Sequence, residues 1–222
     1  MLVALVAGLL TDWFADRAGG AGPSRCERFA AASVDRAREV TGTGRRVVVI
    51  GDSWSVGLGL ADPAASWPAR LPGSVHVAGF SGSGFSEHAS ECGPVSFADR
   101  VPAALADGAD LVVVEGGLND YDQPDAAITS GFVRLVREVG ARRLVVVGPA
   151  DAPSRTAEVP RVDALLAALC DEYAGPYVRT AGLALSYLDD DLHLTAVSHV
   201  VFGDAVAAGI ESVSARPAAT GR

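Results

Sequence analysis

Short runs of β-branched residues alternate along this chain with helix-length amphipathic stretches, and this alternation restricts the fold more than any other feature of the sequence. The clearest run, Arg46-Val-Val-Val-Ile50, is typical of a strand buried on both faces. Strands are expected at residues 46–50, 75–77, 110–115, 143–148 and 177–180. Strands that alternate with helices join through right-handed crossovers into a parallel sheet.

The intervening stretches complete an α/β fold. Helices are expected at residues 24–40, 97–106, 125–139, 159–173 and 196–212. Ser24 and Glu27 form a candidate capping box at the start of the first helix. In the last helix, apolar residues recur at helical spacing at Val197, Val200, Val201, Ala205 and Ala208, which predicts its apolar face. We predict a three-layer α/β/α, flavodoxin-like domain around a central parallel sheet of about five strands.

The length and the charge limit the domain count and the partners. The 222 residues suit one domain, which we expect to cover residues 24–215, followed by a flexible tail at 216–222. The formal net charge is −9, and the only dense basic spots are two arginine pairs ahead of apolar runs. Binding to phosphate backbones needs clustered cations, so we expect no nucleic-acid partner and no attraction to an anionic membrane.

The N-terminus and the cysteines leave alternatives open. Residues 1–10 are apolar but shorter than a membrane span. We interpret residues 1–23 as an apolar N-terminal arm or the remnant of an export segment, which favours an exported or membrane-associated protein over a cytoplasmic one. No later stretch predicts a stable membrane span. Cys26, Cys92 and Cys170 lack metal-site spacing, and their number allows one disulfide or none.

Polar, mostly glycine-rich segments follow the predicted strands, where ligands bind in such sheets. They are Gly51-Asp-Ser-Trp-Ser55, Gly79-Phe-Ser-Gly-Ser-Gly-Phe85, Gly116-Gly-Leu-Asn-Asp120 and, near the C-terminus, Asp189-Asp-Asp-Leu-His193. Together they offer a nucleophile, a base, an acid to orient the base and donors for an oxyanion, which are the groups that ester hydrolysis needs.

Each of these residues also has an ordinary structural interpretation. Ser53 directly follows a strand and can be a nucleophile or a helix N-cap. His193 can be a base or a structural histidine, and one of three neighbouring aspartates, Asp189 to Asp191, can orient it. Asn119 can donate to an oxyanion or form an Asx-turn, and Gly82 can offer a bare amide or simply make a turn.

In combination, these segments resemble the conserved blocks of the SGNH/GDSL hydrolases. Gly51-Asp52-Ser53 is similar to the first block, Gly117-Leu118-Asn119-Asp120 to the third, and Asp190-Asp191-Leu192-His193 to the fifth. Gly82 is similar to the second-block glycine, with Gly79 and Gly84 as alternatives. The resemblance spans residues 47 to about 203.

The resemblance implies a serine esterase that uses no metal and no cofactor. Ser53 would be the nucleophile, His193 the base and Asp190 its orienting acid. The backbone amides of Ser53 and Gly82 and the side chain of Asn119 would form the oxyanion hole.

Aromatic residues near these segments suggest the substrate class. Trp54, Phe80, Phe85 and Tyr121 are candidate substrate-binding residues, and two of them, Phe80 and Phe85, lie in a long loop after the second strand. No segment is long enough for a large lid, so we expect small-molecule or carbohydrate esters with a short acyl group such as acetyl. The alternatives are a metal-dependent phosphoesterase, with Asp52, Asn119, Asp120, Asp189–Asp191 and His193 as candidate ligands, and a non-catalytic ligand-binding domain of the same fold.

Overall fold

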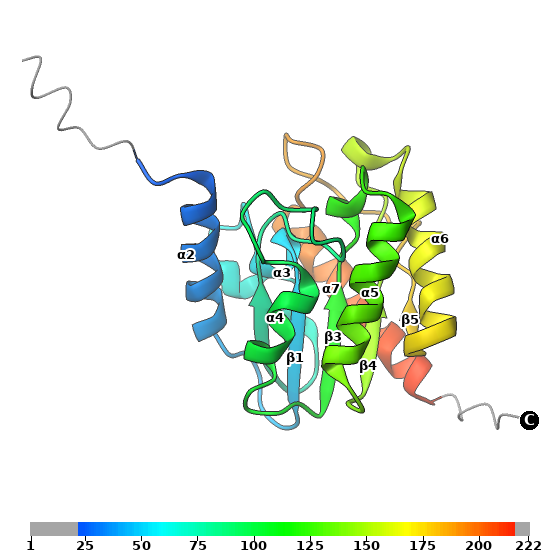
Figure 1. Ribbon diagram of the computed structural model, residues 1–222. Coiled ribbons are helices and arrows are strands. Elements are labelled where there is room, and N and C mark those ends of the chain that lie inside the picture. Colours follow the sequence, from blue (N-terminus) through cyan, green and yellow to red (C-terminus); the bar gives the residue numbers. More distant parts are fainter. Residues whose placement is uncertain (1–21, 216–222) are drawn as a thin grey trace, which may run out of the picture.

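A computed structural model of the chain describes residues 22–215, which contain a five-stranded parallel sheet in the order β2-β1-β3-β4-β5 (Figure 1). The strands are β1 (Arg46–Gly51), β2 (Ser74–Gly79), β3 (Leu111–Glu115), β4 (Leu144–Val147) and β5 (Tyr177–Val178). This strand order is that of flavodoxin-like sheets. The predicted α/β fold is therefore confirmed, and each predicted strand is present with ends that differ by a few residues.

Helices connect the strands. They are α2 (Arg25–Arg38), α3 (Ser53–Val56), α4 (Phe97–Ala104), α5 (Asp125–Val139), α6 (Val159–Leu169) and α7 (Ala196–Ala215). Short helical turns are η1 (Pro63–Ala65), η2 (Trp67–Arg70), η3 (Leu118–Asp120), η4 (Pro153–Arg155) and the π-helical η5 (Cys170–Ala174). The helix predicted at 159–173 corresponds to α6 and η5 together.

Successive strand residues face opposite layers. In β1, Val47 and Val49 belong to one core cluster, whereas Val48 and Ile50 belong to the other. The first cluster contains residues of α3, η2 and α7, and the second contains residues of α4, α5 and α6. Both faces of the sheet are thus covered, which explains why its strands are continuous apolar runs.

Helix α7 corrects one prediction. Val197, Val200 and Val201 lie on its exposed side, and the face that enters the core carries Phe202, Val206 and Ile210. The prediction of its apolar face is therefore wrong. By length and composition alone, the segment 196–213 also passes as a membrane span, one such helix among the described residues. Core helices of globular proteins pass the same test, so this is weak evidence for a span.

Helix α2 lies beside the sheet edge formed by β2 (Figure 1). Its predicted capping box is present: Ser24 Oγ accepts from the Glu27 amide at 3.2 Å, and the Glu27 carboxylate accepts from the Ser24 amide at 2.6 Å. Ser33 Oγ donates to the Gly79 carbonyl oxygen at 2.5 Å. The predicted arm at residues 1–23 falls mostly outside the described residues, and the predicted tail at 216–222 lies wholly outside them.

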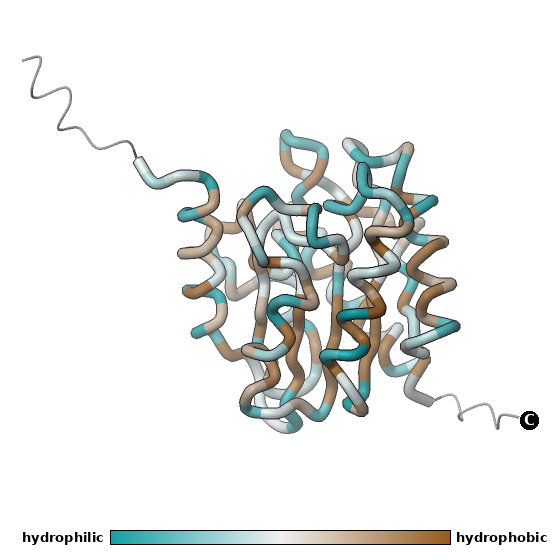
Figure 2. Tube along the Cα trace, viewed as in Figure 1, coloured by the Kyte–Doolittle hydropathy of each residue, from teal (hydrophilic) through white to brown (hydrophobic). Residues whose placement is uncertain are grey.

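The carboxyl ends of the strands lie at the upper edge of the sheet in Figure 1. Strand β1 pairs with both β2 and β3, and the chain leaves β1 and β3 toward helices on opposite faces. Figure 2 shows mostly hydrophobic strands below this edge and more hydrophilic loops above it. A crevice at such a switch point is where ligands bind in open α/β sheets.

Candidate active site

Ser53 begins helix α3 directly after β1, at the carboxyl edge of the sheet. Asp52 caps this helix, because its Oδ1 atom accepts from the Trp54 amide at 2.9 Å. The cap therefore belongs to Asp52, and Ser53 Oγ is left for another contact. The Ser53 side chain reaches the end of the distant segment that precedes α7.

His193 and Asp190 lie beside Ser53. His193 Nε2 is 3.1 Å from Ser53 Oγ, and His193 Nδ1 is 2.5 Å from Asp190 Oδ2. The other oxygen of Asp190 accepts from the backbone amides of Leu192 and His193 at 3.0 and 2.9 Å. Ser53, His193 and Asp190 are thus arranged as nucleophile, base and orienting acid would be.

Asp190 is held in its ionised form. Its slight burial acts to raise its pKa, but the hydrogen bonds from the side chain and amide of His193 and from the Leu192 amide lower it to about 2. Asp189 and Asp191 make no hydrogen bond to His193 among the described residues. The backbone of Asp191 is left-handed, with φ of 54°, which closes the turn between Asp190 and His193.

Two backbone amides and one side-chain amide are the candidate oxyanion donors. Among the described residues, the backbone amides of Ser53 and Gly82 have no hydrogen-bond partner, which leaves them available to an oxyanion. Gly82 has φ of 80°, a conformation that favours glycine. Of the two alternatives, Gly79 ends β2, and a Cβ at Gly84 would come within 2.5 Å of the Asp120 carboxylate.

The Asn119 side chain is already engaged. Its Nδ2 atom donates to Asp52 Oδ2 at 3.1 Å and to the Ser83 carbonyl oxygen at 2.9 Å. An amide nitrogen carries two hydrogens, so donation to a ligand would require one of these bonds to be shared or released. The same contacts link the loops after β1, β2 and β3 to one another.

Three buried carboxyl groups lie beneath these loops, and burial raises the pKa of each. The pKa of Asp52 is raised to about 6, and that of Asp120 to about 7. The pKa of Glu115, at the end of β3, is raised well above its usual value by burial and by the nearby Asp52. Glu115 accepts a hydrogen bond from Ser55 Oγ at 2.8 Å, and Asp120 accepts from the amides of Phe85 and Ser86.

Arg100 is a half-buried cation that contacts the ends of β1 and β2 and the loop after β2. Its guanidinium donates to the Gly51 carbonyl oxygen at 3.0 Å, to Ser83 Oγ at 2.8 Å and to the Ala78 carbonyl oxygen. Burial lowers its pKa to about 9. The sequence did not predict Arg100 and Glu115 as parts of the site. Arg100 does not follow a strand, and a single charged residue at the end of an apolar run, such as Glu115, does not by itself indicate a functional site.

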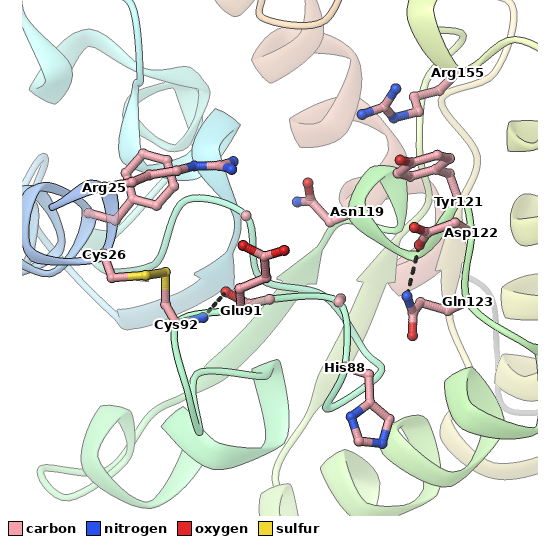
Figure 3. Close-up of a pocket in the computed structure, with 14 residues that line it drawn as sticks. Arg25, Cys26, His88, Glu91, Cys92, Asn119, Tyr121, Asp122, Gln123 and Arg155 are labelled. Carbon is pink, nitrogen blue, oxygen red and sulfur yellow. Dashed lines mark hydrogen bonds between the residues drawn. A yellow bond between two sulfur atoms is a disulfide. The ribbon is translucent and has the colours of Figure 1, made fainter.

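Beside Gly82 and Asn119 lies a pocket of about 340 Å³ (Figure 3). Its walls come from the start of α2, the loop after β2, the segment after β3, and η4. The lining side chains are mostly polar or charged and include Arg25, His88, Glu91, Tyr121, Asp122 and Arg155. This size is at the low end for ligand pockets.

Only one of the four predicted substrate-binding aromatic residues lines this pocket, and it is Tyr121. Trp54 and Phe85 are 1% and 0% exposed and belong to the two core clusters, so the prediction for them is wrong. Trp54 Nε1 donates to the Leu192 carbonyl oxygen at 3.1 Å, and its ring packs on Phe202. Phe80 is nearly buried and packs edge-on against Phe29, which lines the pocket in its place.

A disulfide between Cys26 and Cys92 forms part of the pocket wall and joins α2 to the loop after β2. Cys170 is a buried free thiol. The histidine closest in sequence to His193 is structural: His199 is buried, Nδ1 accepts from the Trp67 amide at 3.3 Å, and burial lowers its pKa to about 4.

Some candidate ligands of the alternative metal site contact one another in pairs: Asn119 contacts Asp52, and Asp190 contacts His193. Within residues 22–215, no group of three or more His, Cys, Asp or Glu side chains is placed to hold a metal ion. Asp52 and Asp120 instead accept hydrogen bonds from backbone and side-chain N–H groups, as described above.

Comparison with a family model matches residues 49–200 of the chain to the GDSL-like lipase/acylhydrolase family. A search of curated proteins gave no match. The matched segment begins within β1 and ends within α7, so it includes Ser53, Asn119 and His193 but not α2.

Solved structures share the fold. A protein of Agrobacterium tumefaciens assigned as an arylesterase superposes with a TM-score of 0.62 at 24% identity, over 77% of this chain and 100% of its own. Est24, a carbohydrate acetylesterase from Sinorhizobium meliloti, gives 0.57 at 22% identity over the same shares. A family two carbohydrate esterase from Clostridium thermocellum, in complex with cellohexaose, gives 0.62 at 15% identity, over 78% of this chain and 65% of its own.

Proposed function

The chain belongs to the GDSL-like lipase/acylhydrolase family and is a carboxylic ester hydrolase, and on this premise we propose that it cleaves short-chain acyl esters with Ser53 as the nucleophile. The observation that carries the proposal is the continuous chain of contacts from Ser53 Oγ through His193 to Asp190. The resemblance of the sequence to this family is confirmed by the match.

The proposed reaction has two halves. Ser53 Oγ attacks the ester carbonyl carbon while its proton passes to His193 Nε2, which is an acceptor when Nδ1–H is donated to Asp190. The bond to the leaving alkoxide then breaks, and His193 returns the proton to that oxygen. Water next attacks the acyl-Ser53 ester with the same proton path, which releases the carboxylic acid and restores Ser53.

Stabilisation of the negative charge on the carbonyl oxygen is assigned to the amides of Ser53 and Gly82 and to Asn119. The two backbone amides have no partner among the described residues, which supports their role. One of the two Asn119 Nδ2 hydrogens, which are donated to Ser83 and to Asp52, would then be shared with the oxyanion.

The small polar pocket supports a short acyl group on a polar alcohol. Two of the structurally similar proteins are carbohydrate esterases, one of them an acetylesterase. We therefore propose acetyl-type esters of small molecules or carbohydrates as the substrate class. A long acyl chain would have to lie against charged side chains, which costs the free energy of their desolvation.

The test compares wild type with Ser53→Ala on para-nitrophenyl acetate, butyrate and octanoate, each with and without EDTA. We expect turnover that needs Ser53, resists EDTA and falls with chain length. Ser130→Ala, at an exposed position of α5, is the control and should behave as wild type. Turnover that survives Ser53→Ala and is abolished by EDTA would overturn the proposal in favour of a metal-dependent enzyme.

A further inference from the structure

Two arginines face each other across the pocket beside Gly82 and Asn119. Arg25 comes from the first turn of α2, and Arg155 comes from η4. Figure 3 shows both side chains pointing from opposite sides toward the space in front of Asn119. Neither residue has a role in the proposed reaction.

Each guanidinium group lies over an aromatic ring. The Arg155 Cζ atom is 3.8 Å from the centre of the Tyr121 ring, and the Arg25 Cζ atom is 5.1 Å from that of Phe29. Cation–π contact of this kind holds the group in place while its in-plane N–H bonds remain available. Such an edge matches a carboxylate, which can accept two parallel hydrogen bonds.

Neither arginine forms an ion pair with an acidic side chain within the described part of the chain. Arg155 donates to the neighbouring Ser154 carbonyl oxygen at 3.0 Å, and no ion pair involves Arg25 or Arg155. Seven other arginines do pair with a carboxylate: Arg38, Arg46, Arg70, Arg134, Arg137, Arg161 and Arg179. Two cations that form no ion pair and line the same pocket are candidates to bind an anionic ligand.

The same pocket also contains two acidic residues, Glu91 and Asp122. Asp122 accepts a hydrogen bond from Gln123 Nε2 at 2.8 Å, and Glu91 lies next to Cys92 on the wall formed by the loop after β2. Neither forms an ion pair with either arginine among the described residues. These carboxylates are acceptors that hydroxyl groups of a ligand can reach while an anionic group meets the arginines.

We propose that this pocket binds a carboxylate carried by the ester substrate, with Arg25 and Arg155 as the residues that determine this specificity. The inference rests on the proposed function, since the pocket adjoins the groups assigned to the oxyanion. Helix α2 precedes the segment that matches the family, so Arg25 reaches the site from outside that segment. The disulfide from Cys26 to Cys92 fastens the first turn of α2 to the pocket wall.

The test uses two pairs of esters that differ in charge but hardly in size. In the first pair the charge is on the acyl side: mono(para-nitrophenyl) glutarate against para-nitrophenyl pentanoate. In the second it is on the alcohol side: para-acetoxybenzoate against para-acetoxybenzamide. We expect wild type to prefer the anionic member of at least one pair by about tenfold in kcat/KM, the size of one charge-assisted hydrogen bond.

Arg25→Gln and Arg155→Gln should each reduce this preference by several-fold, because kcat/KM for the anionic ester falls more than kcat/KM for the neutral ester. Arg38→Gln is the matched control, because Arg38 lies at the other end of α2 and pairs with Asp35. It removes the same overall charge and should keep the wild-type preference.

Two results would overturn the inference. One is a Ser53-dependent wild type that turns over the neutral member of both pairs as fast as the anionic one. The other is a preference that Arg25→Gln and Arg155→Gln leave unchanged, or that Arg38→Gln reduces equally. The proposed function fails in a different way, through turnover that Ser53→Ala retains, and a lack of turnover of all four esters would count against both.

Discussion

Asp52 connects two groups that the proposed reaction uses. One of its oxygens caps the helix that begins at Ser53, and the other accepts from the Asn119 side chain at 3.1 Å. The nucleophile and the amide are thereby held at a set separation by one buried carboxyl group. Preorganisation of this kind lowers the barrier, because the donors need not reorient as charge develops.

Asn119→Ala is expected to lower kcat by about 10²-fold, as the loss of one oxyanion donor does. The measurement is steady-state kinetics on para-nitrophenyl acetate, with the melting temperature as a check on folding. Ser83→Ala is the control, because it disturbs the Arg100 contact of the same loop and leaves the amide in place. A loss in Asn119→Ala below about threefold, or one matched by Ser83→Ala, would limit Asn119 to holding the loop.

At the scale of elements, a hydrogen bond to Glu115 holds helix α3 in place. Ser55 Oγ donates to Glu115 Oε2 at 2.8 Å and accepts from Trp67 Nε1 at 3.1 Å, which joins α3, β3 and η2. Because burial and the nearby Asp52 raise the pKa of Glu115 well above its usual value, we expect this side chain to be neutral. A neutral amide of the same shape should therefore replace it.

Glu115→Gln should keep both the stability and the turnover of wild type, since its side-chain oxygen can still accept from Ser55. Glu115→Ala leaves the buried hydroxyl of Ser55 without its acceptor and should lower the unfolding free energy by about 1–3 kcal/mol. Urea unfolding and kcat on para-nitrophenyl acetate are the measurements. Equal losses in the two variants would show that the charge of Glu115, rather than its acceptor, supports α3.

The disulfide joins α2 to the loop after β2 across 66 positions of the sequence. The double variant Cys26→Ala/Cys92→Ala should lower the unfolding free energy by about 2–4 kcal/mol, the usual effect of losing such a crosslink. Urea unfolding without reductant measures it, and reduced wild type should match the variant. An unchanged midpoint would contradict the expectation.

Cys170 should not react with thiol reagents in the folded protein, because burial raises its pKa to about 12.

At the scale of the whole molecule, the buried carboxyl groups tie stability to pH. The folded-state pKa values of Asp52 and Asp120, about 6 and about 7, both exceed the ordinary value of 3.8. Between these limits the folded protein binds more protons than the unfolded chain, so stability increases as the pH falls through 7. His199, with its pKa lowered to about 4 from 6.5, acts in the opposite sense once the pH is below 6.5.

The melting temperature should therefore be higher at about pH 6.5 than at about pH 8, by about 2–4 °C if the net gain is about 1 kcal/mol. The thermal unfolding scans should also be repeated in high salt, which screens repulsion among the surface charges. Most of the difference in melting temperature between the two pH values should remain. Asp120→Asn, which cannot take up the proton, should show a smaller difference than wild type. A melting temperature that is flat or lower at the more acidic pH would contradict the assignment.

The sequence by itself determined the features that depend on short stretches of chain. Runs of β-branched residues predicted the strands, because only a strand buried on both faces is apolar at every position. The capping box of Ser24 and Glu27 was also predicted from a short stretch of sequence, because its two partners lie three residues apart. The segments around Ser53, Gly82, Asn119 and His193 were expected together because parallel strands end at one edge of the sheet.

The tertiary structure decided whatever depends on which elements cover one another. Trp54 and Phe85 looked like pocket walls, but α7 and α5 pack over them and place them in the core. The turn at Asp191 selected Asp190 from three adjacent aspartates. The pairing of Cys26 with Cys92 and the position of Arg25 at the pocket also follow from where α2 docks. Burial and long-range proximity are properties of the assembled layers, so no local pattern of residues could predict them.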